Sequence, residues 1–135
     1  MKSNFSDVVE FNKRFCIPTP GQVTLITTSD MQERVDFIYE ELAELVDGFN
    51  KADVEEVADA LIDIAYVVMG TAIRLGLPWE ELWDDVHRAN MAKQPGITKR
   101  NMKYDCIKPE GWVGPKTREI LASHNLGKGD EIGEK

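Results

Sequence analysis

The chain has 135 residues and a formal net charge of −8, a size that suits one domain with a modest hydrophobic core. So acidic a composition argues against a protein that coats nucleic acid or binds an anionic membrane surface. The charge is uneven, because residues 93–118 carry seven Lys and Arg against two acids. A strongly acidic centre is therefore followed by a basic C-terminal segment.

The two cysteines, Cys16 and Cys106, lie in no spacing that is typical of a metal site. Isolated cysteines of this kind are more common as reduced thiols in a cytosolic protein than as a disulfide. The first 15 residues lack the continuous apolar segment of a signal peptide, and no apolar run approaches the roughly 18 residues of a membrane span. We therefore expect a cytoplasmic protein that has no membrane among its partners.

Residues 6–15 are predicted to form the first helix, with Ser6 or Asp7 as its cap, and the prolines and glycine of "CIPTPGQVT" end it. A second helix is predicted from about residue 30 to 49, because "SDMQ" offers Ser29 as N-cap with Gln32 three positions on. Its apolar residues recur at spacings of three and four, which predicts one core-facing stripe. The stripe comprises Met31, Val35, Ile38, Leu42, Leu45 and Phe49.

A third helix is predicted from Asp53, with Glu56 completing a capping box, to about Leu75, where Gly76 ends it. Its apolar stripe comprises Val54, Val57, Leu61, Ile64, Val68 and Ala72. A fourth helix is predicted over residues 78–92, since proline is favoured at a helix start.

The remaining residues are expected to be irregular up to about residue 115, followed by one short helical turn. Residues 125–135 are expected to be a flexible tail. The predicted fold class is all-α, with four to five helices in one domain over residues 1–124 and no sheet.

Carboxylates gather on both sides of the break at residues 47–53. Glu41 and Glu44 are three residues apart and lie on one helical face, which Glu40 flanks. On the next helix Glu56, Asp59 and Asp63 follow one stripe. The short connection favours an antiparallel hairpin, in which Glu41 and Glu44 face Glu56 and Asp59.

Carboxylates that converge in a partly buried groove repel one another and rise in pKa unless cations lie among them. Oxygen ligands in this number suit Mg²⁺ or Mn²⁺ and not zinc. Magnesium held by carboxylates keeps positions open for phosphate oxygens, and paired ions stabilise phosphoryl displacement. The sequence therefore predicts metal-dependent phosphoryl chemistry.

The alternative is an acidic face exposed to solvent, which is what a run of charge usually means. Three features weigh against it. Arg34 is the only basic residue between positions 30 and 50, so pairing at i, i+4 is nearly absent. Asp59 and Asp63 lie within an apolar segment, where a buried charge needs a reason. Both acidic pairs also flank the same turn.

ExxE in "ELAE" followed by ExxD in "EVAD" on consecutive helices resembles the all-α nucleotide pyrophosphohydrolases, the superfamily of MazG-like, HisE-like and dimeric dUTPase enzymes. The segments "FIYEELAEL", "VADALIDIAYVVMGTAIRLGLP" and "VHRANMAKQ" resemble its small HisE-like, phosphoribosyl-ATP pyrophosphohydrolase-like branch of phages and bacteria. The resemblance covers residues 5–121. It implies a helical bundle that assembles into a dimer or tetramer in the cytoplasm of a bacterium or a phage-infected cell.

The resemblance also implies the roles of the acidic residues. Glu41, Glu44, Glu56 and Asp59 would ligate two or three Mg²⁺ or Mn²⁺ ions. Glu40 would bind an additional ion or orient the attacking water, and it forms the predicted catalytic pair with Glu41. Asp63 is expected to support this set without ligating metal.

Positive charge is also needed to bind a triphosphate. The resemblance points to Asn90 and Lys93 in "NMAK" for phosphate or sugar contacts, and Lys108 is the next candidate. Asn12 is a candidate for the base, together with Phe11, Phe15 and Trp112.

Apolar residues beyond the main stripe of the third helix indicate a subunit interface, and a tetramer is favoured slightly over a dimer. These residues are Ile62, Tyr66, Val67 and Met69.

The resulting hypothesis is a hydrolase that cleaves a (deoxy)nucleoside triphosphate between the α and β phosphates to a monophosphate and pyrophosphate. Control of nucleotide pools is the expected role, with a purine such as dGTP as the expected substrate and no nucleic-acid polymer as partner. Two alternatives stay open: a true phosphoribosyl-ATP pyrophosphohydrolase, and a non-catalytic helical module that binds metal or a basic partner.

Overall fold

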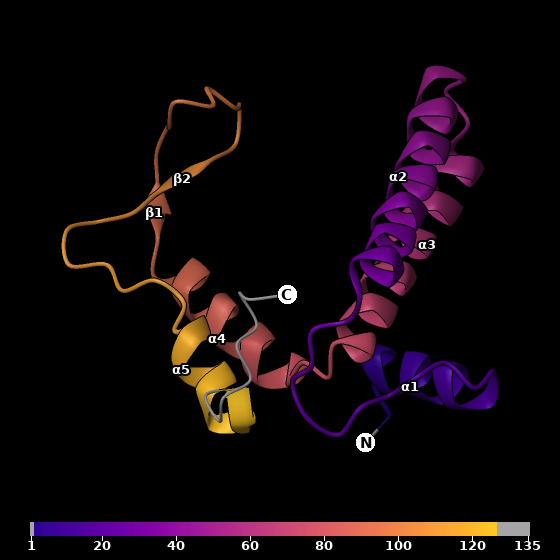
Figure 1. The fold of residues 1–135 in the computed structure, drawn as a ribbon. Helices are drawn as coiled ribbons and strands as arrows, with labels where there is room; N and C mark the ends of the chain where they lie inside the picture. The colour runs from indigo at the N-terminus through magenta and orange to yellow at the C-terminus, as the bar shows by residue number, and fades with distance from the viewer. Residues whose placement is uncertain (1, 127–135) are drawn as a thin grey trace. The chain divides into compact units, whose positions relative to one another are not determined.

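The computed structural model describes residues 2–126, which are predominantly helical. They form two compact units, one reaching to Leu77 and the other spanning Pro78–His124. Figure 1 labels the helices and strands of both units. The tail predicted from residue 125 lies, from residue 127 onward, outside the described residues.

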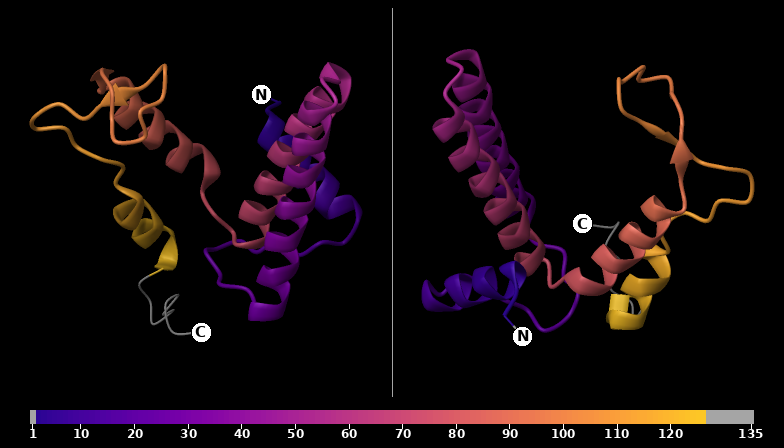
Figure 2. Two further views of the ribbon diagram at one scale, coloured as in Figure 1. Left: turned by 90° about the horizontal axis from the view of Figure 1, so that it is seen from above. Right: turned by 180° about the vertical axis from the view of Figure 1, so that it is seen from behind.

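The first unit consists of α1 (Asn4–Arg14), α2 (Thr28–Asn50) and α3 (Val54–Arg74). Helices α2 and α3 lie side by side along their length and are joined by a tight turn, while α1 packs against α3 (Figures 1 and 2). The predicted helical hairpin is therefore confirmed. No helix among the described residues has both the length and the apolar character needed to cross a bilayer.

Helix starts differ from the prediction where two residues of equal capping ability compete. Helix α1 begins two residues early because Ser3 and Ser6 form a reciprocal capping box, at 2.9 and 3.1 Å. Helix α2 begins early because the Thr27 hydroxyl accepts the Asp30 amide at 3.1 Å. Asp53 caps α3 as predicted, accepting the amides of Glu55 and Glu56.

The contact between α2 and α3 is more polar than the predicted stripes indicate. Arg34 donates from Nε to the Thr71 hydroxyl and from Nη2 to the Val67 carbonyl, both at 3.0 Å. Gly70 leaves room for this guanidinium, since a Cβ at Gly70 would lie 2.9 Å from Arg34 Nη2. Burial, with Arg74 nearby, lowers the pKa of Arg34.

The residues that are buried on α2 lie on the same face of the helix as Arg34. On α2 the buried residues are Glu41 and Gly48, seven positions apart and in line with Arg34. Leu42 and Phe49 from the predicted stripe are exposed instead. On α3 the buried residues include the small side chains of Ala60 and Ala72.

Gly76 ends α3 as predicted. Its φ of +63° is the left-handed conformation that glycine adopts without a steric cost. A Cβ there would lie 2.0 Å from the Gln22 carbonyl oxygen. The loop before α2 is fixed at this point, because the Thr24 amide donates to the Leu75 carbonyl at 2.9 Å.

The second unit consists of α4 (Trp79–Met91), β1 (Gln94–Pro95), β2 (Cys106–Ile107) and α5 (Thr117–Leu121), followed by a π-helical turn over Ala122–Leu126. The small antiparallel ladder pairs Gln94 with Ile107 and Pro95 with Cys106. The prediction that the chain has no sheet was therefore wrong, because a two-residue strand is too short to show alternation of apolar and polar residues.

Candidate functional site

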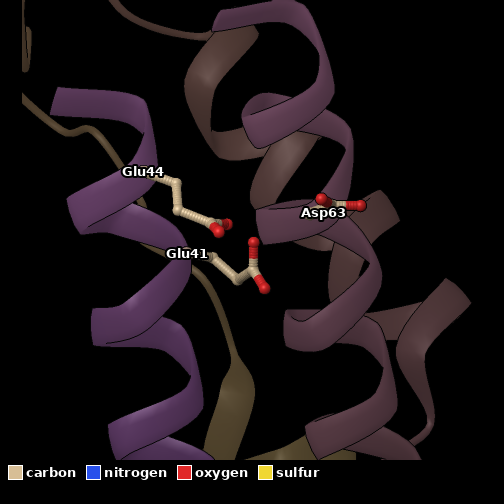
Figure 3. A group of neighbouring side chains, drawn as sticks. All are labelled: Glu41, Glu44 and Asp63. Carbon is tan, nitrogen blue, oxygen red and sulfur yellow. The ribbon is translucent and has the colours of Figure 1, made fainter. Parts of the chain in front are cut away.

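The hairpin brings three carboxylates together. Glu41 and Glu44 extend from α2 and Asp63 from α3, and each offers an oxygen that lies within 4.8 Å of the other two (Figure 3). Glu41 is only 8% exposed, and its Oε2 is buried without a hydrogen-bond partner among the described residues. Glu44 and Asp63 are exposed, so the cluster opens to solvent.

This environment raises the pKa of Glu41 from its ordinary value of 4.5 to about 7. The largest cause is the hydrogen bond that protonated Glu41 donates to Glu44, followed by burial. The negative charges of Glu44, Asp63 and Glu40 act in the same direction. In the absence of a cation, Glu41 therefore keeps its proton up to about pH 7.

The three carboxylates fit a divalent cation. A buried carboxylate oxygen without a partner is costly unless a proton or a cation satisfies it, and two further carboxylates are placed to share the ion. A set of ligands made only of carboxylate oxygens suits a hard ion such as Mg²⁺ or Mn²⁺. Glu41, Glu44 and Asp63 are therefore the residues that would hold the metal.

The other three predicted ligands lie outside this close cluster. Glu56 packs against Gly48 at the turn, where a glycine Cβ would meet its Cγ at 3.1 Å, and its carboxylate lies 3.7 Å from Lys51 Nζ. Asp59 is exposed on α3, one turn before Asp63. Glu40 is exposed on α2 and acts on Glu41 through its charge. Within residues 2–126, none of these three belongs to the close cluster.

Register explains why Asp63 joins the cluster. Gly48 and Glu56 are opposite each other across the turn. Seven residues before Gly48 is Glu41, and seven residues after Glu56 is Asp63, so two helical turns on each side bring these carboxylates to the same level. Once the structure pairs Gly48 with Glu56, counting seven residues from each leads to Glu41 and Asp63.

An aromatic groove of about 330 Å³ lies between α1 and α3. The Phe11 ring is 4.7 Å from Phe15 and meets Tyr66 edge-on at 5.4 Å. Asp7, Glu10 and Arg14 complete the lining. Tyr66 follows Asp63 by three residues on α3, so the groove and the carboxylate cluster occupy neighbouring turns of the same helix. Asn12, predicted for the base, is buried instead and does not line the groove.

The predicted phosphate ligands meet in the second unit. Lys93 Nζ and Lys108 Nζ lie over the Trp112 ring, 5.6 and 4.9 Å from its centroid. Both lysines line a cavity of about 480 Å³. Asn90 is exposed near the end of α4, where its carbonyl accepts the Lys93 amide at 3.1 Å.

Comparison with known proteins identifies the family. The family model for phosphoribosyl-ATP pyrophosphohydrolase matches residues 8–90, which include the carboxylate cluster and the lining of the aromatic groove except Asp7. An uncharacterized protein of Acanthamoeba polyphaga mimivirus is 37% identical, over 78% of this chain and 42% of that protein. This chain thus spans less than half the length of that relative. On the strength of the family match, the chain belongs to the phosphoribosyl-ATP pyrophosphohydrolase family, part of the MazG-like and HisE-like superfamily.

Proposed function

We propose that this protein is a metal-dependent hydrolase that cleaves a (deoxy)nucleoside triphosphate between the α and β phosphates, releasing a monophosphate and pyrophosphate. The observation that carries the proposal is the buried, unpartnered Oε2 of Glu41 beside Glu44 and Asp63. Family membership implies a pyrophosphohydrolase in general. The carboxylate cluster supplies the reason for a metal.

Glu41, Glu44 and Asp63 would hold the first ion, and Glu56 and Asp59 would extend the set to a second or third. Bound divalent cations neutralise the carboxylates and withdraw negative charge from phosphate oxygens. Glu40, which is exposed and next to Glu41, would accept a hydrogen bond from the attacking water and orient it. The water oxygen forms a bond to one phosphorus as the bridging oxygen leaves with the other, and the water proton passes to solvent.

The aromatic groove supports a purine substrate. Phe11, Phe15 and Tyr66 offer apolar ring surface of the kind that contacts a base. The groove also carries the carboxylates of Asp7 and Glu10, which only accept hydrogen bonds when ionised. Guanine presents two adjacent N–H donors that match a carboxylate. We therefore infer a guanine nucleotide such as dGTP, with control of nucleotide pools as the role.

A second candidate is hydrolysis of phosphoribosyl-ATP, which is favoured by the family model that matches the chain. Its substrate has the same α–β phosphate bond, so the carboxylate cluster serves either reaction. The base and sugar sites would then accommodate a phosphoribosyl group. A direct assay with phosphoribosyl-ATP separates the two candidates.

The test is product analysis on a panel of ribo- and deoxynucleoside triphosphates and phosphoribosyl-ATP, each with Mg²⁺, Mn²⁺ or EDTA. We expect monophosphate and pyrophosphate from guanine nucleotides, with no turnover in EDTA. Glu41→Gln keeps the side-chain shape but loses the charge, and should lower kcat by at least about 100-fold.

Glu55→Gln is the matched control, since Glu55 is an exposed acid at the start of α3 outside the cluster. It should retain activity within about twofold. Release of orthophosphate alone, or metal binding without turnover of any substrate, would contradict the proposal and favour the non-catalytic module. Turnover of phosphoribosyl-ATP alone would establish the second candidate.

A further inference from the structure

Residues 93–108 form an arm that follows α4 and lies beyond residue 90, where the family match ends. We propose that this arm, together with Trp112, is a metal-independent binding site for a condensed phosphate: pyrophosphate, or the polyphosphate chain of a nucleotide. The choice of a condensed phosphate rests on the proposed function. The anion site itself rests only on contacts within the second unit.

The ladder of the arm places two like charges directly opposite each other. Gln94 pairs with Ile107, so in antiparallel register the next positions outward are Lys93 and Lys108. Like charges at opposed positions of a ladder are destabilising. Both ammonium groups lie over the Trp112 ring, whose negative face offsets part of this repulsion. The fold thus directs two cations at one aromatic ring, and a bound anion would offset their repulsion.

Trp112 is itself fixed in place. Its indole Nε1 donates to the Ala89 carbonyl of α4 at 2.7 Å. Its amide donates to the Pro109 carbonyl at 3.0 Å, closing a turn in which Gly111 adopts a φ of +77°. The two lysines are therefore directed by a platform that is anchored on both sides.

The cavity beside these lysines carries excess positive charge. It is lined by Lys93, Thr98, Lys99, Arg100, Cys106, Ile107 and Lys108. The neighbouring acid, Asp105, offsets the charge of Arg100 and also accepts hydrogen bonds from the Thr98 hydroxyl and the Cys106 amide, which leaves the lysine charges uncompensated. Among the described residues, no carboxylate forms an ion pair with Lys93, Lys99 or Lys108.

The arrangement suits adjacent phosphoryl groups better than a single small anion. A volume of about 480 Å³ exceeds what one phosphate ion requires, and it falls in the range of sites for small organic ligands. Lysine donates through a point charge, so separate lysines can each contact a different phosphoryl group. Such a site would hold the substrate's phosphate chain or the released pyrophosphate.

The test follows the Trp112 indole N–H by NMR while pyrophosphate is added to the full chain in EDTA. The peak is assigned by its loss in Trp112→Phe. We expect pyrophosphate to shift this peak and leave those of Trp79 and Trp83 in place. Lys108→Gln should weaken binding by about tenfold or more, since one charge-assisted contact is lost.

Lys103→Gln is the matched control, because Lys103 belongs to the same arm and lies 5.5 Å over Tyr104 but does not line the cavity. It should change pyrophosphate affinity by less than about twofold. Equal weakening by the two variants, an equal shift from sulfate at the same concentration, or tighter binding of single-stranded RNA would each overturn the inference.

Glu41→Gln separates this inference from the proposed function. In EDTA it should bind pyrophosphate as the unchanged protein does, and loss of the Trp112 shift in this variant would contradict the arm as the site. If the protein binds pyrophosphate at the arm but hydrolyses no nucleotide, the proposed function is contradicted and the inference about the arm is not. If the protein hydrolyses nucleotides but pyrophosphate does not shift the Trp112 peak, the inference about the arm is contradicted and the proposed function is not.

Discussion

Glu41 shows how one buried carboxylate links folding, protons and metal. Without metal the folded protein keeps a proton on Glu41 up to about pH 7, whereas the unfolded chain releases it near pH 4.5. The folded state binds more protons between these values, so stability falls as the pH rises from 4.5 to 7. In EDTA we expect the melting temperature of the unchanged protein to decrease across this range. Glu41→Gln should remove the part of this decrease that comes from the Glu41 carboxyl.

Metal should reverse this dependence, because a cation requires the ionised carboxylate that the proton otherwise occupies. The stabilisation by Mg²⁺ should therefore increase from pH 5 to pH 8, as measured by calorimetry. The comparison is between Glu41→Gln and Glu55→Gln, and only Glu55→Gln should keep the full dependence of stability on pH. Identical pH profiles for the two variants would contradict this account of Glu41.

Among the elements, the C-terminal end of α3 is the point at which the helical hairpin is joined to the loop before α2. A Cβ on Gly76 would collide with the Gln22 carbonyl and would also sit in a left-handed conformation. Gly76→Ala should lower the free energy of unfolding by roughly 2–3 kcal/mol. Urea unfolding followed by far-UV circular dichroism measures the change.

Gly21→Ala is the control for this prediction. Gly21 lies in the same loop, but a Cβ there meets nothing within 4 Å. This substitution should change the free energy of unfolding by no more than about 0.5 kcal/mol. If both glycines tolerate alanine equally, close packing at the end of α3 does not stabilise the unit.

For the whole molecule, the exposed apolar surface of the hairpin is the dominant feature. Large side chains on α2 and α3 remain exposed in the single chain, among them Phe49 (74%), Leu61 (52%) and Ile62 (67%). Such surfaces commonly mark subunit interfaces. We predict a homo-oligomer, with a tetramer favoured over a dimer, in which these side chains are covered by another copy.

Sedimentation velocity at micromolar concentration measures the assembly. Leu61→Glu should shift the protein to a smaller species, because a buried charge at an interface has no partner. Val113→Glu is the control, since Val113 has a similar exposure of 53% but belongs to the second unit. A monomeric unchanged protein, or equal behaviour of the two variants, would contradict the predicted interface.

Local pattern was sufficient for the helices and their hairpin. Asp53 as a cap and Gly76 as a stop are read within a few residues, and the structure confirms both. The predicted apolar stripes were wrong in part, because Leu42, Phe49 and Leu61 are exposed. The helix starts at Ser3 and Thr27 differ because serine and threonine cap almost equally well wherever they occur. The positions of the acidic and basic residues also predicted the acidic hairpin and the basic segment after α4, since charge can be counted in the sequence itself.

Only the tertiary structure decided which charges meet. Asp63 joins Glu41 and Glu44, and Lys93 lies opposite Lys108, because each pairing depends on the register of two segments that are distant in the chain. A shift of one residue in either register would bring different side chains together with almost no change in local propensity. The sequence by itself therefore determined the elements and their charge, and packing determined the constellation of side chains that can bind a metal or a phosphate.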